Sequence, residues 1–484
     1  MKIPRFLIAA GASGSGKTLV TCGLLQAYLN RGRRIASFKC GPDYIDPMFH
    51  SQVLGTKSRN LDSFFTGEEE TRQRLIENAE GYDLAVMEGV MGFYDGVAGI
   101  STRASAYDVA RITDTPVLLL VNCKGMSVSV AAYIEGFMRY KEDSHIKGIL
   151  LNQLSPMMYD RMKTMIEEQL SIPVFGYIPK VEDCILESRH LGLVMPEEID
   201  DLQEKLKKLA GILEKTVDLD GIEQLAGQAP DLEKMETTFQ MKKWSVSQKV
   251  SANTSSNTSS TISLDMNQVS DPNIRIGVAK DEAFCFFYED NLQLLKKMGA
   301  ELIYFSPIHD EKIPEKLDGL LLNGGYPELY ARKLGENKSM RQSVRDMLTG
   351  GLPCIAECGG FLYLHDQMED KEGTPYPMVG VISGEAHYTG KLSRFGYITL
   401  SEGTAFGQNV GPMPAHEFHY YDSTNCGESF LAEKPLSKRS WRCIHTSDTL
   451  LAGFPHNYFY GNIKLAEAFY EKCVEYRRKR EDET

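Results

Sequence analysis

The chain has 484 residues, which is too long for one ordinary hydrophobic core, so we expect two or more domains. Hydrophobic residues make up 42% and charged residues 25%, as in soluble globular proteins, and no run approaches the roughly 20 apolar residues of a membrane span. The net charge of −13 argues against nucleic acid as a partner, because phosphate backbones bind clustered Lys and Arg.

Ten cysteines are spread along the chain without a Cys-x-x-Cys pair, and the N-terminus has no long apolar signal segment. In a chain of this length the pattern predicts reduced thiols and not a disulfide framework. We therefore expect a cytoplasmic protein.

The first predicted strand, residues 6–10, runs into a glycine-rich turn, and a helical pattern over residues 19–31 follows. The turn has the P-loop spacing Gly-x4-Gly-Lys-Thr, in which glycines let backbone N–H groups point at phosphate oxygens. We expect Lys17 to reach the β- and γ-phosphates and the Thr18 hydroxyl to bind Mg²⁺. The residues expected to bind the nucleotide are Gly11, Ser13, Gly14, Ser15, Gly16, Lys17 and Thr18. A surface turn rich in Gly and Ser is the alternative interpretation.

Short apolar strands then alternate with segments of helix length. These strands are predicted at residues 35–40, 83–87, 116–121, 147–152 and 173–178. The alternation predicts a mostly parallel sheet covered by helices on both faces. A charged amphipathic helix at residues 200–217 would close this unit, which we interpret as a P-loop NTPase domain over residues 1–240.

A stretch rich in Ser, Thr and Asn interrupts the pattern, and we interpret residues 241–272 as a flexible linker. A second α/β pattern occupies residues 273–484. Its strands are predicted at residues 274–279, 301–305, 319–322 and 352–356, with helices between them. The sequence therefore predicts two α/β domains without an internal repeat.

The first candidate site lies where three stretches of the N-terminal domain follow predicted strands, because open α/β sheets bind ligands at the carboxyl ends of their strands. The first stretch, residues 38–47, places Lys39, Asp43 and Asp46 around a Gly-Pro turn. Such carboxylates hold Mg²⁺ beside a nucleotide or steer a substrate. Turn formation is the alternative for both Asp residues, since Asp and Pro favour turns.

The second stretch, residues 88–96, begins with Glu88 at the position of a Walker-B acid, and Asp95 follows in a loop flanked by glycines. An ordinary strand-end carboxylate and a turn-forming Asp are the alternatives. The third stretch contains Arg189 and His190 after the last strand of the domain. A histidine in such a place is more often structural than a ligand.

The second candidate site is a cysteine of the C-terminal domain. Cys358 follows a predicted strand and precedes a Gly-Gly turn and a helix, a nucleophile elbow in which the helix N-terminus favours the thiolate. Upstream, Gly324 and Gly325 end another strand, and their backbone N–H groups could form an oxyanion hole. Downstream, His419 and His456 compete as the base, and the residues alone do not decide between them. A buried structural thiol is the alternative for Cys358.

Seven short motifs, distributed over both halves of the chain, together resemble one enzyme family. They are GSGKT (14–18), KCGPDYIDP (39–47), EGVMGFYDG (88–96), RHLGL (189–193), GGYPE (324–328), ECGG (357–360) and EFHY (417–420). The family is that of cobyrinate a,c-diamide synthase, and the resemblance extends over nearly the whole chain apart from the Ser/Thr/Asn-rich stretch. It implies an α/β fold of two domains, a P-loop domain similar to dethiobiotin synthetase and a class I glutamine amidotransferase-like domain.

The resemblance implies a ligase of cobalamin biosynthesis. In this family ATP and Mg²⁺ activate the a- and c-acetate carboxylates of the corrin ring as acyl phosphates, and ammonia converts each into a primary amide. Glutamine supplies the ammonia by hydrolysis through a thioester, which the resemblance assigns to Cys358. The expected partners are therefore the corrinoid, glutamine and ATP.

Matching positions imply roles for individual residues. The metal ligands would be Thr18, Asp43 and Glu88. The nucleotide would also contact Lys39 and Asn152. The carboxylates that position substrate and stabilise intermediates would be Asp43, Asp46 and Asp95. The residues that line the substrate would be Tyr44, Arg189, His190, Glu417 and His419. His456 matches the amidotransferase histidine of the family, so the resemblance selects it as the base.

One position departs from the wider amidotransferase pattern. A Glu two residues after the His would complete a triad, but that position holds Tyr458, so the group that orients His456 stays open. The substrate is open as well, because synthases that act on hydrogenobyrinate or nickel-sirohydrochlorin share these motifs. An ATP-driven switch without bond formation is a third interpretation, and a homodimer is one option for the oligomeric state.

Overall fold

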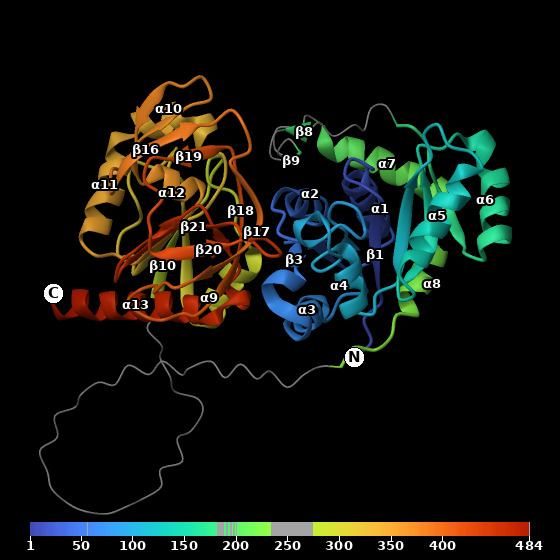
Figure 1. The fold of residues 1–484 in the computed structure, drawn as a ribbon, viewed down its shortest axis with the longest axis horizontal. Helices are drawn as coiled ribbons and strands as arrows, with labels where there is room; N and C mark the ends of the chain where they lie inside the picture. Colours follow the sequence, from blue (N-terminus) through green and yellow to red (C-terminus); the bar gives the residue numbers. More distant parts are fainter. Residues whose placement is uncertain are drawn as a thin grey trace, which may run out of the picture.

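The computed structural model describes residues 1–55, 57–181, 188–189, 192–193, 196, 199, 201–233 and 274–483. They form two α/β units that lie side by side, the N-terminal unit drawn in blue to green and the C-terminal unit in yellow to red (Figure 1). The linker expected at residues 241–272 falls outside the described residues. The linker, the domain boundaries and the cytoplasmic location therefore remain predictions.

The N-terminal sheet has seven strands in the order β3-β2-β4-β1-β5-β6-β7, and all neighbouring pairs are parallel. The strands are β1 (Arg5–Ala10), β2 (Ile35–Cys40), β3 (Arg59–Leu61), β4 (Leu84–Glu88), β5 (Val117–Asn122), β6 (Ile146–Asn152) and β7 (Val174–Ile178). Side chains of β1 alternate between two buried clusters, with Leu7 and Ala9 on one face and Phe6 and Ile8 on the other. A sheet that is buried on both faces needs such continuous apolar strands, and the predicted parallel sheet is confirmed.

Helices cover both faces of this sheet. One face packs against α1 (Lys17–Asn30), α2 (Ile45–Leu54), α7 (Leu202–Thr216) and α8 (Leu219–Gly227). The other packs against α3 (Ser63–Ala79), α4 (Ala106–Ile112), α5 (Ser129–Tyr140) and α6 (Pro156–Leu170). The strand order brings the carboxyl ends of β1, β2 and β4 together, so the P-loop, Lys39 and Glu88 share one edge of the sheet. Among the helices of the described residues, none combines the length with the apolar content of a bilayer-spanning segment.

The C-terminal unit is built on a six-stranded sheet in the order β11-β10-β12-β13-β23-β22, which is parallel except where β22 meets β23. The strands are β10 (Ile274–Ala279), β11 (Ala300–Phe305), β12 (Gly319–Leu322), β13 (Cys354–Glu357), β22 (His445–Thr446) and β23 (Leu450–Gly453). The four strands predicted for this domain are all present, which agrees with the predicted α/β fold.

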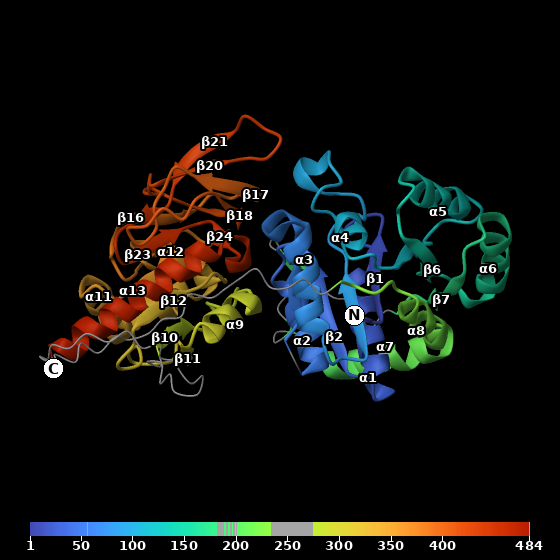
Figure 2. The same ribbon diagram turned by 90° about the horizontal axis from the view of Figure 1, so that it is seen from below.

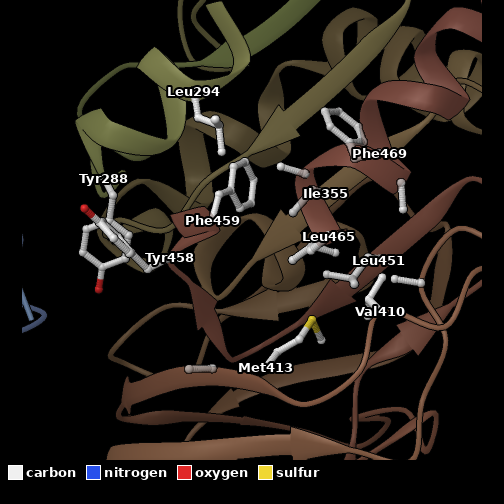
Figure 3. Close-up of a cluster of buried hydrophobic side chains, with 14 of the residues drawn as sticks. Tyr288, Leu294, Ile355, Val410, Met413, Leu451, Tyr458, Phe459, Leu465 and Phe469 are labelled. Atoms are coloured by element: carbon white, nitrogen blue, oxygen red, sulfur yellow. The ribbon is translucent and has the colours of Figure 1, made fainter. Parts of the chain in front are cut away.

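Two helical layers enclose this second sheet. The helices are α9 (Glu289–Lys297) and α13 (Ile463–Asp482) on one face, and α10 (Ala331–Glu336), α11 (Lys338–Thr349) and α12 (Gly359–Tyr363) on the other. Figure 3 shows part of the first cluster, in which Leu465 and Phe469 of α13 lie near Ile355 and Leu451 of the sheet. This core fixes the strand ends from which the second candidate site is built.

Smaller sheets complete the structure and were not predicted. Their orders are β21-β20-β17-β18-β24, β15-β14-β16-β19 and β8-β9. The strands are β8 (Ser188–Arg189), β9 (Gly192–Leu193), β14 (His365–Glu369), β15 (Pro375–Pro377), β16 (Ile382–Tyr388), β17 (Arg394–Ser401), β18 (Met413–His419), β19 (Tyr421–Ser423), β20 (Phe430–Glu433), β21 (Ser440–Cys443) and β24 (His456–Asn457). β24 pairs with β18, which sets His456 opposite His416.

The two units share a buried, aromatic interface. Helices α2 and α3 lie on the side of the N-terminal unit that faces the C-terminal unit (Figures 1 and 2). Phe64 and Phe65 of α3 belong to a buried cluster made mostly of C-terminal residues. The Phe64 ring stacks on Tyr397 of β17 with centroids 4.4 Å apart, and Tyr397 Oη donates a 2.7 Å hydrogen bond to Asp62. The interface therefore joins the carboxyl edge of the first sheet to the second domain.

Candidate active sites

The loop between β1 and α1 holds the predicted phosphate-binding residues. Gly14 and Gly16 have φ values of +73° and +87°, which residues with side chains rarely adopt. A Cβ on Gly11 would lie 1.6 Å from Tyr133 Oη, so a larger residue at that position would displace the Tyr133 side chain. α1 begins at Lys17 directly after the loop, and its N-terminus adds partial positive charge where phosphates would bind.

Lys17 and Asn152 hold the P-loop against neighbouring segments. Lys17 Nζ donates to the carbonyl oxygens of Ala12 (3.1 Å) and Met91 (2.6 Å). Burial lowers the pKa of Lys17 to about 8. Asn152 Nδ2 donates to the carbonyl oxygen of Ser15 at 2.9 Å. That bond shapes the loop, whereas the nucleotide contact that the resemblance implies for Asn152 stays a prediction.

A buried cluster of charges surrounds Glu88 at the end of β4. Thr18 Oγ1 donates to Glu88 Oε1 at 2.7 Å, and Lys39 Nζ lies 2.9 Å from the same oxygen. Glu88 Oε2 lies 2.7 Å from His50 Nε2, and Lys39 Nζ also pairs with Asp46. Burial alone would raise the pKa of Glu88, but Lys39 and His50 hold it well below its usual range. Glu88 is therefore an ionised carboxylate beside the P-loop.

The other predicted carboxylates differ in what they contact. Asp46 adjoins Lys39, and burial raises its pKa, with Asp43 adding to the effect. Asp43 Oδ1 accepts hydrogen bonds from the backbone N–H groups two and three residues further on, at 2.8 and 3.3 Å, and so fixes the start of α2. Asp95 Oδ2 accepts one from Gly92 N–H at 3.0 Å and closes a turn. Asp43 and Asp95 thus make turn contacts, and a catalytic role for either stays a proposal.

His50 is a member of this cluster that the sequence analysis missed. It is buried, with Nε2 on Glu88 and Nδ1 at 3.0 Å from Ser37 Oγ and 3.3 Å from Ser58 Oγ. Because both ring nitrogens are engaged, the ring holds the carboxylate in one orientation. A signal was present in the sequence, since Asp46 and His50 are four residues apart and share one face of α2.

The remaining predicted residues of the first site are only partly described. Arg189 belongs to β8, but its side chain lies outside the described structure. The whole of His190 also lies outside the described residues. Their contacts with a substrate remain predictions.

Cys358 lies at a sharp turn between β13 and α12, as the nucleophile-elbow pattern predicts. Its φ of +47° and ψ of −102° fall in a region that residues other than glycine rarely occupy. The Gly-Gly pair lets the helix approach the sheet, since a Cβ on Gly360 would lie 2.0 Å from the carbonyl oxygen of Leu322. The Cys358 N–H donates to the carbonyl oxygen of Gly453 at 2.8 Å, which ties the elbow to β23.

Gly324 and Gly325, the predicted oxyanion-hole residues, lie against this elbow. A Cβ on Gly324 would be 2.6 Å from His456 Cε1 and 3.6 Å from Cys358 Cβ. A Cβ on Gly359 would be 3.1 Å from the backbone nitrogen of Gly325, whose φ is +156°. Gly324 therefore borders both Cys358 and His456, and an oxyanion hole formed by the N–H groups of Gly324 and Gly325 stays a prediction.

His456 is the imidazole beside Cys358, and Glu357 is the carboxylate beside His456. His456 Nδ1 lies 3.8 Å from Glu357 Oε2. Glu357 Oε1 accepts hydrogen bonds from the N–H (3.1 Å) and Nδ2 (2.9 Å) of Asn457. Burial alone would lower the pKa of His456, but Cys358 and Glu357 raise it to about 10. The arrangement favours an imidazolium next to the Cys358 sulfur, so a proton donor lies beside the nucleophile.

This geometry offers a candidate for the orienting group that the sequence left open, although His456 Nδ1 has no partner within hydrogen-bond distance in the described structure. Tyr458 occupies the position of the usual triad Glu, and its hydroxyl donates a 2.7 Å hydrogen bond to Asp290. The carboxylate next to His456 comes instead from Glu357, the residue before the nucleophile. Sequence reasoning missed it because we sought the orienting group after the histidine. In the fold, β23 pairs with β13 so that Gly453 lies opposite Glu357, and His456 follows three residues further on.

His419 and Glu417, which the resemblance assigned to the substrate, are buried on β18. His419 Nδ1 lies 2.6 Å from the carbonyl oxygen of Tyr421, its ring stacks on Phe454 at 3.8 Å, and burial lowers its pKa to about 4. Glu417 lies 3.8 Å from Arg394, and burial raises its pKa to about 7. A contact of either residue with a substrate stays a prediction.

Glu357→Gln tests the orienting role through the pH dependence of glutamine hydrolysis. Without this carboxylate charge the His456 imidazolium should lose its proton at lower pH, because Glu357 is one of the two groups that raise its pKa. We expect kcat/KM for glutamine to fall about 10²-fold and the alkaline limb of its pH profile to move to lower pH. The amide keeps an oxygen for Asn457, so folding should be unchanged. An alkaline limb at the parent position would contradict the role.

The fold and the two centres define a class of protein, in which a P-loop nucleotide-binding unit is joined to a glutamine amidotransferase unit. The family described as the CobQ/CobB/MinD/ParA nucleotide binding domain matches residues 6–194. The family described as the CobB/CobQ-like glutamine amidotransferase domain matches residues 275–459. The protein is therefore an ATP-dependent ligase that uses glutamine.

The chain belongs to the cobyrinate a,c-diamide synthase family, which confirms the resemblance. A relative of that name from Caldanaerobacter subterraneus subsp. tengcongensis is 36% identical over 480 residues, which cover 98% of this chain and 99% of the relative. A second, from Priestia megaterium, is 34% identical and covers 99% of both chains. A third, from Clostridium acetobutylicum, is 37% identical over 94% of this chain and 97% of its own.

Proposed function

We propose that the protein converts the a- and c-acetate carboxylates of cobyrinate into primary amides, with ATP and glutamine, through acyl-phosphate intermediates. Relatives of nearly equal length bear the name of that activity. The observation that carries the proposal is the meeting of two chemically distinct centres at one domain interface. Tyr44 precedes Asp46 of the charged cluster by two residues, and its ring lies 5.2 Å from that of His456.

The N-terminal centre is suited to activate a carboxylate. In the proposed step a carboxylate oxygen of the corrinoid attacks the γ-phosphorus of ATP, the bond to ADP breaks and an acyl phosphate forms. Lys17 lies in the P-loop where it would contact the phosphates, and Lys39 is a second buried cation. Burial alone would lower the pKa of Lys39, but Asp46 and Glu88 raise it, so the side chain stays charged.

The donor set beside the P-loop fits a magnesium ion. Thr18 and Glu88 offer a hydroxyl and an ionised carboxylate 2.7 Å apart. Within the described residues no three His, Cys, Asp or Glu side chains group into a metal-binding cluster. Mg²⁺ is usually held by one or two protein oxygens with phosphates and water, so two donors suffice. Bound there, it would neutralise phosphate charge, and Asp43, engaged at the start of α2, is the less direct candidate.

The C-terminal centre is suited to release ammonia from glutamine. In the proposed cycle the Cys358 thiolate attacks the side-chain amide carbon, and N–H groups of Gly324 and Gly325 stabilise the oxyanion. His456 gives its proton to the leaving nitrogen, ammonia departs and a thioester remains. His456 then takes a proton from water, which attacks the thioester and yields glutamate. The ammonia attacks the acyl phosphate, phosphate leaves and the amide is formed.

Incubation with ATP, Mg²⁺, glutamine and cobyrinate, followed by mass spectrometry, tests the proposal. We expect two successive products, in which first one and then a second carboxyl OH is replaced by NH2. ADP, phosphate and glutamate should form in proportion to the amide. Hydrogenobyrinate and nickel-sirohydrochlorin serve as alternative substrates, and faster amidation of either would reassign the substrate. ATP hydrolysis without any amide would favour the ATP-driven switch.

A further inference from the structure

One short segment of the N-terminal domain reaches both centres. It comprises residues 41–46, which are the loop after β2 and the first two residues of α2, and we call it the bridging segment. At its end, Asp46 contacts Lys39 in the charged cluster. In its middle, the Tyr44 ring lies 5.2 Å from the ring of His456, with the two planes inclined by 56°. A side chain of the synthetase domain therefore packs on the base of the glutaminase centre.

Both domains hold the bridging segment in place. Asn60 Nδ2 of β3 donates to the carbonyl oxygens of Gly41 (2.9 Å) and Asp43 (2.7 Å). From the C-terminal domain, Tyr288 Oη donates to the carbonyl oxygen of Pro42 at 3.2 Å. The Asp43 carboxylate also accepts hydrogen bonds from two backbone N–H groups of the segment. The one aromatic side chain of the segment thus projects from an anchored backbone.

The Tyr44 ring packs among aromatic side chains of the C-terminal domain. It is stacked on Phe286 with centroids 5.2 Å apart and planes inclined by 5°, and it lies 4.5 Å from Tyr288. Tyr288 in turn meets Tyr458 edge to face at 5.2 Å, and both are labelled in Figure 3. Burial raises the pKa of Tyr44 well above its usual range, and Tyr288 and Glu357 add to the effect. Tyr44 is therefore a neutral ring in a fixed aromatic setting.

The other groups described next to His456 come from its own domain. They are Gly324 near Cε1, Glu357 near Nδ1, and Cys358. We propose that Tyr44 is a positioning residue of the glutaminase centre, supplied by the synthetase domain, whose ring keeps the imidazole aligned with Cys358. This rests on the proposed glutaminase function. It differs from the substrate-lining role that the resemblance implied for Tyr44, because it makes glutamine hydrolysis depend on the docked synthetase domain.

Glutamate release by the full chain, measured without nucleotide or corrinoid, tests the proposal. We expect Tyr44→Ala to lower kcat about tenfold and to leave KM for glutamine within about twofold, because a misaligned base slows the chemical step more than binding. Tyr44→Phe keeps the ring and should retain the parent kcat. A role of the hydroxyl would instead lower kcat in both variants and would overturn the assignment to the ring.

Tyr397→Phe is the matched control. It removes an interdomain hydrogen bond, from Tyr397 to Asp62, and keeps the ring that stacks on Phe64. Its kcat should equal that of the parent, and a loss as large as that of Tyr44→Ala would show a general effect of the interface and overturn the proposal. A parent kcat in Tyr44→Ala would overturn it as well. Tyr44→Leu carries the same test if the alanine variant does not fold.

The assay also separates this inference from the substrate assignment. It reads glutamate alone, so its outcome does not depend on which tetrapyrrole is amidated. A parent protein that releases glutamate but amidates none of the three tetrapyrroles would remove the proposed substrate and leave the role of Tyr44 standing. If the parent protein releases no glutamate, both the proposed substrate and the proposed role of Tyr44 are contradicted.

Discussion

Cys358→Ala should abolish amide formation from glutamine while amide formation from ammonium salts continues. The sulfur of Cys358 is the atom that bonds to the side-chain carbonyl carbon of glutamine, and the methyl group of alanine cannot form this bond. We expect the glutamine-dependent rate to fall at least about 10³-fold. The rate with concentrated ammonium chloride at alkaline pH, where more of the ammonia is neutral, should equal that of the parent. Parallel assays of corrinoid amide with the two nitrogen sources measure both rates.

Cys354→Ala is the matched control for this experiment. Cys354 lies four residues upstream, at the start of β13, and burial raises the pKa of its thiol well above the usual range. It should therefore remain a protonated, structural thiol, and its replacement should leave both rates near those of the parent. Loss of both activities in Cys358→Ala would contradict the proposed division of work between the two domains.

The N-terminal fold could be predicted because most of its strands are indicated by short stretches of the sequence itself. Each central strand is a short apolar run, and the strand bounds expected for β2, β4 and β5 differ from those observed by one residue at most. β3 was missed since it has only three residues, Arg59–Leu61, and one of them is apolar. An edge strand of this kind forms because it pairs with β2, and that pairing leaves no pattern in the sequence of β3.

The antiparallel sheets of the C-terminal domain could not be predicted in the same way. β17 and β18 pair over seven residues, and β24 adds only two residues to this sheet. Two residues carry no periodicity, so the strand that positions His456 is visible only in the folded chain. Without that pairing the sequence left His419 and His456 as equal candidates, and the resemblance was needed to choose.

The candidate sites divide along the same line. The P-loop and the elbow at Cys358 each follow from one strand, one turn and one helix, so residues that are close in sequence make the site. Glu357, His50 and Tyr44 act through partners far away along the chain, as in the 3.8 Å approach of Glu357 to His456. Such partners are fixed by sheet order and domain docking, which local patterns do not encode.

Glu88→Gln should remove amide formation with either nitrogen source and spare glutamine hydrolysis. The amide has nearly the same shape as the carboxylate but carries no charge. Lys39 and His50 then lose an anionic partner, and the donor set beside Thr18 loses its ionised oxygen. We expect the ammonium-dependent rate to fall at least about 10²-fold, because preorganised charge at the phosphates supplies much of the stabilisation of the transition state. Corrinoid amide and glutamate, measured in the same sample, report the two centres separately.

The rate of glutamine hydrolysis by Glu88→Gln shows whether this variant is folded. Removing one member of a buried ion pair costs about 3 kcal/mol of unfolding free energy, which urea denaturation would register. A variant that has lost only stability would still regain synthesis at low temperature, whereas one that has lost the carboxylate charge at the phosphates would not. Glu69→Gln, at an exposed position of α3, should change neither rate. Near-parent synthesis by Glu88→Gln would remove Glu88 from the proposed metal site and shift that role toward Asp46 or Asp43, the other carboxylates near Lys39.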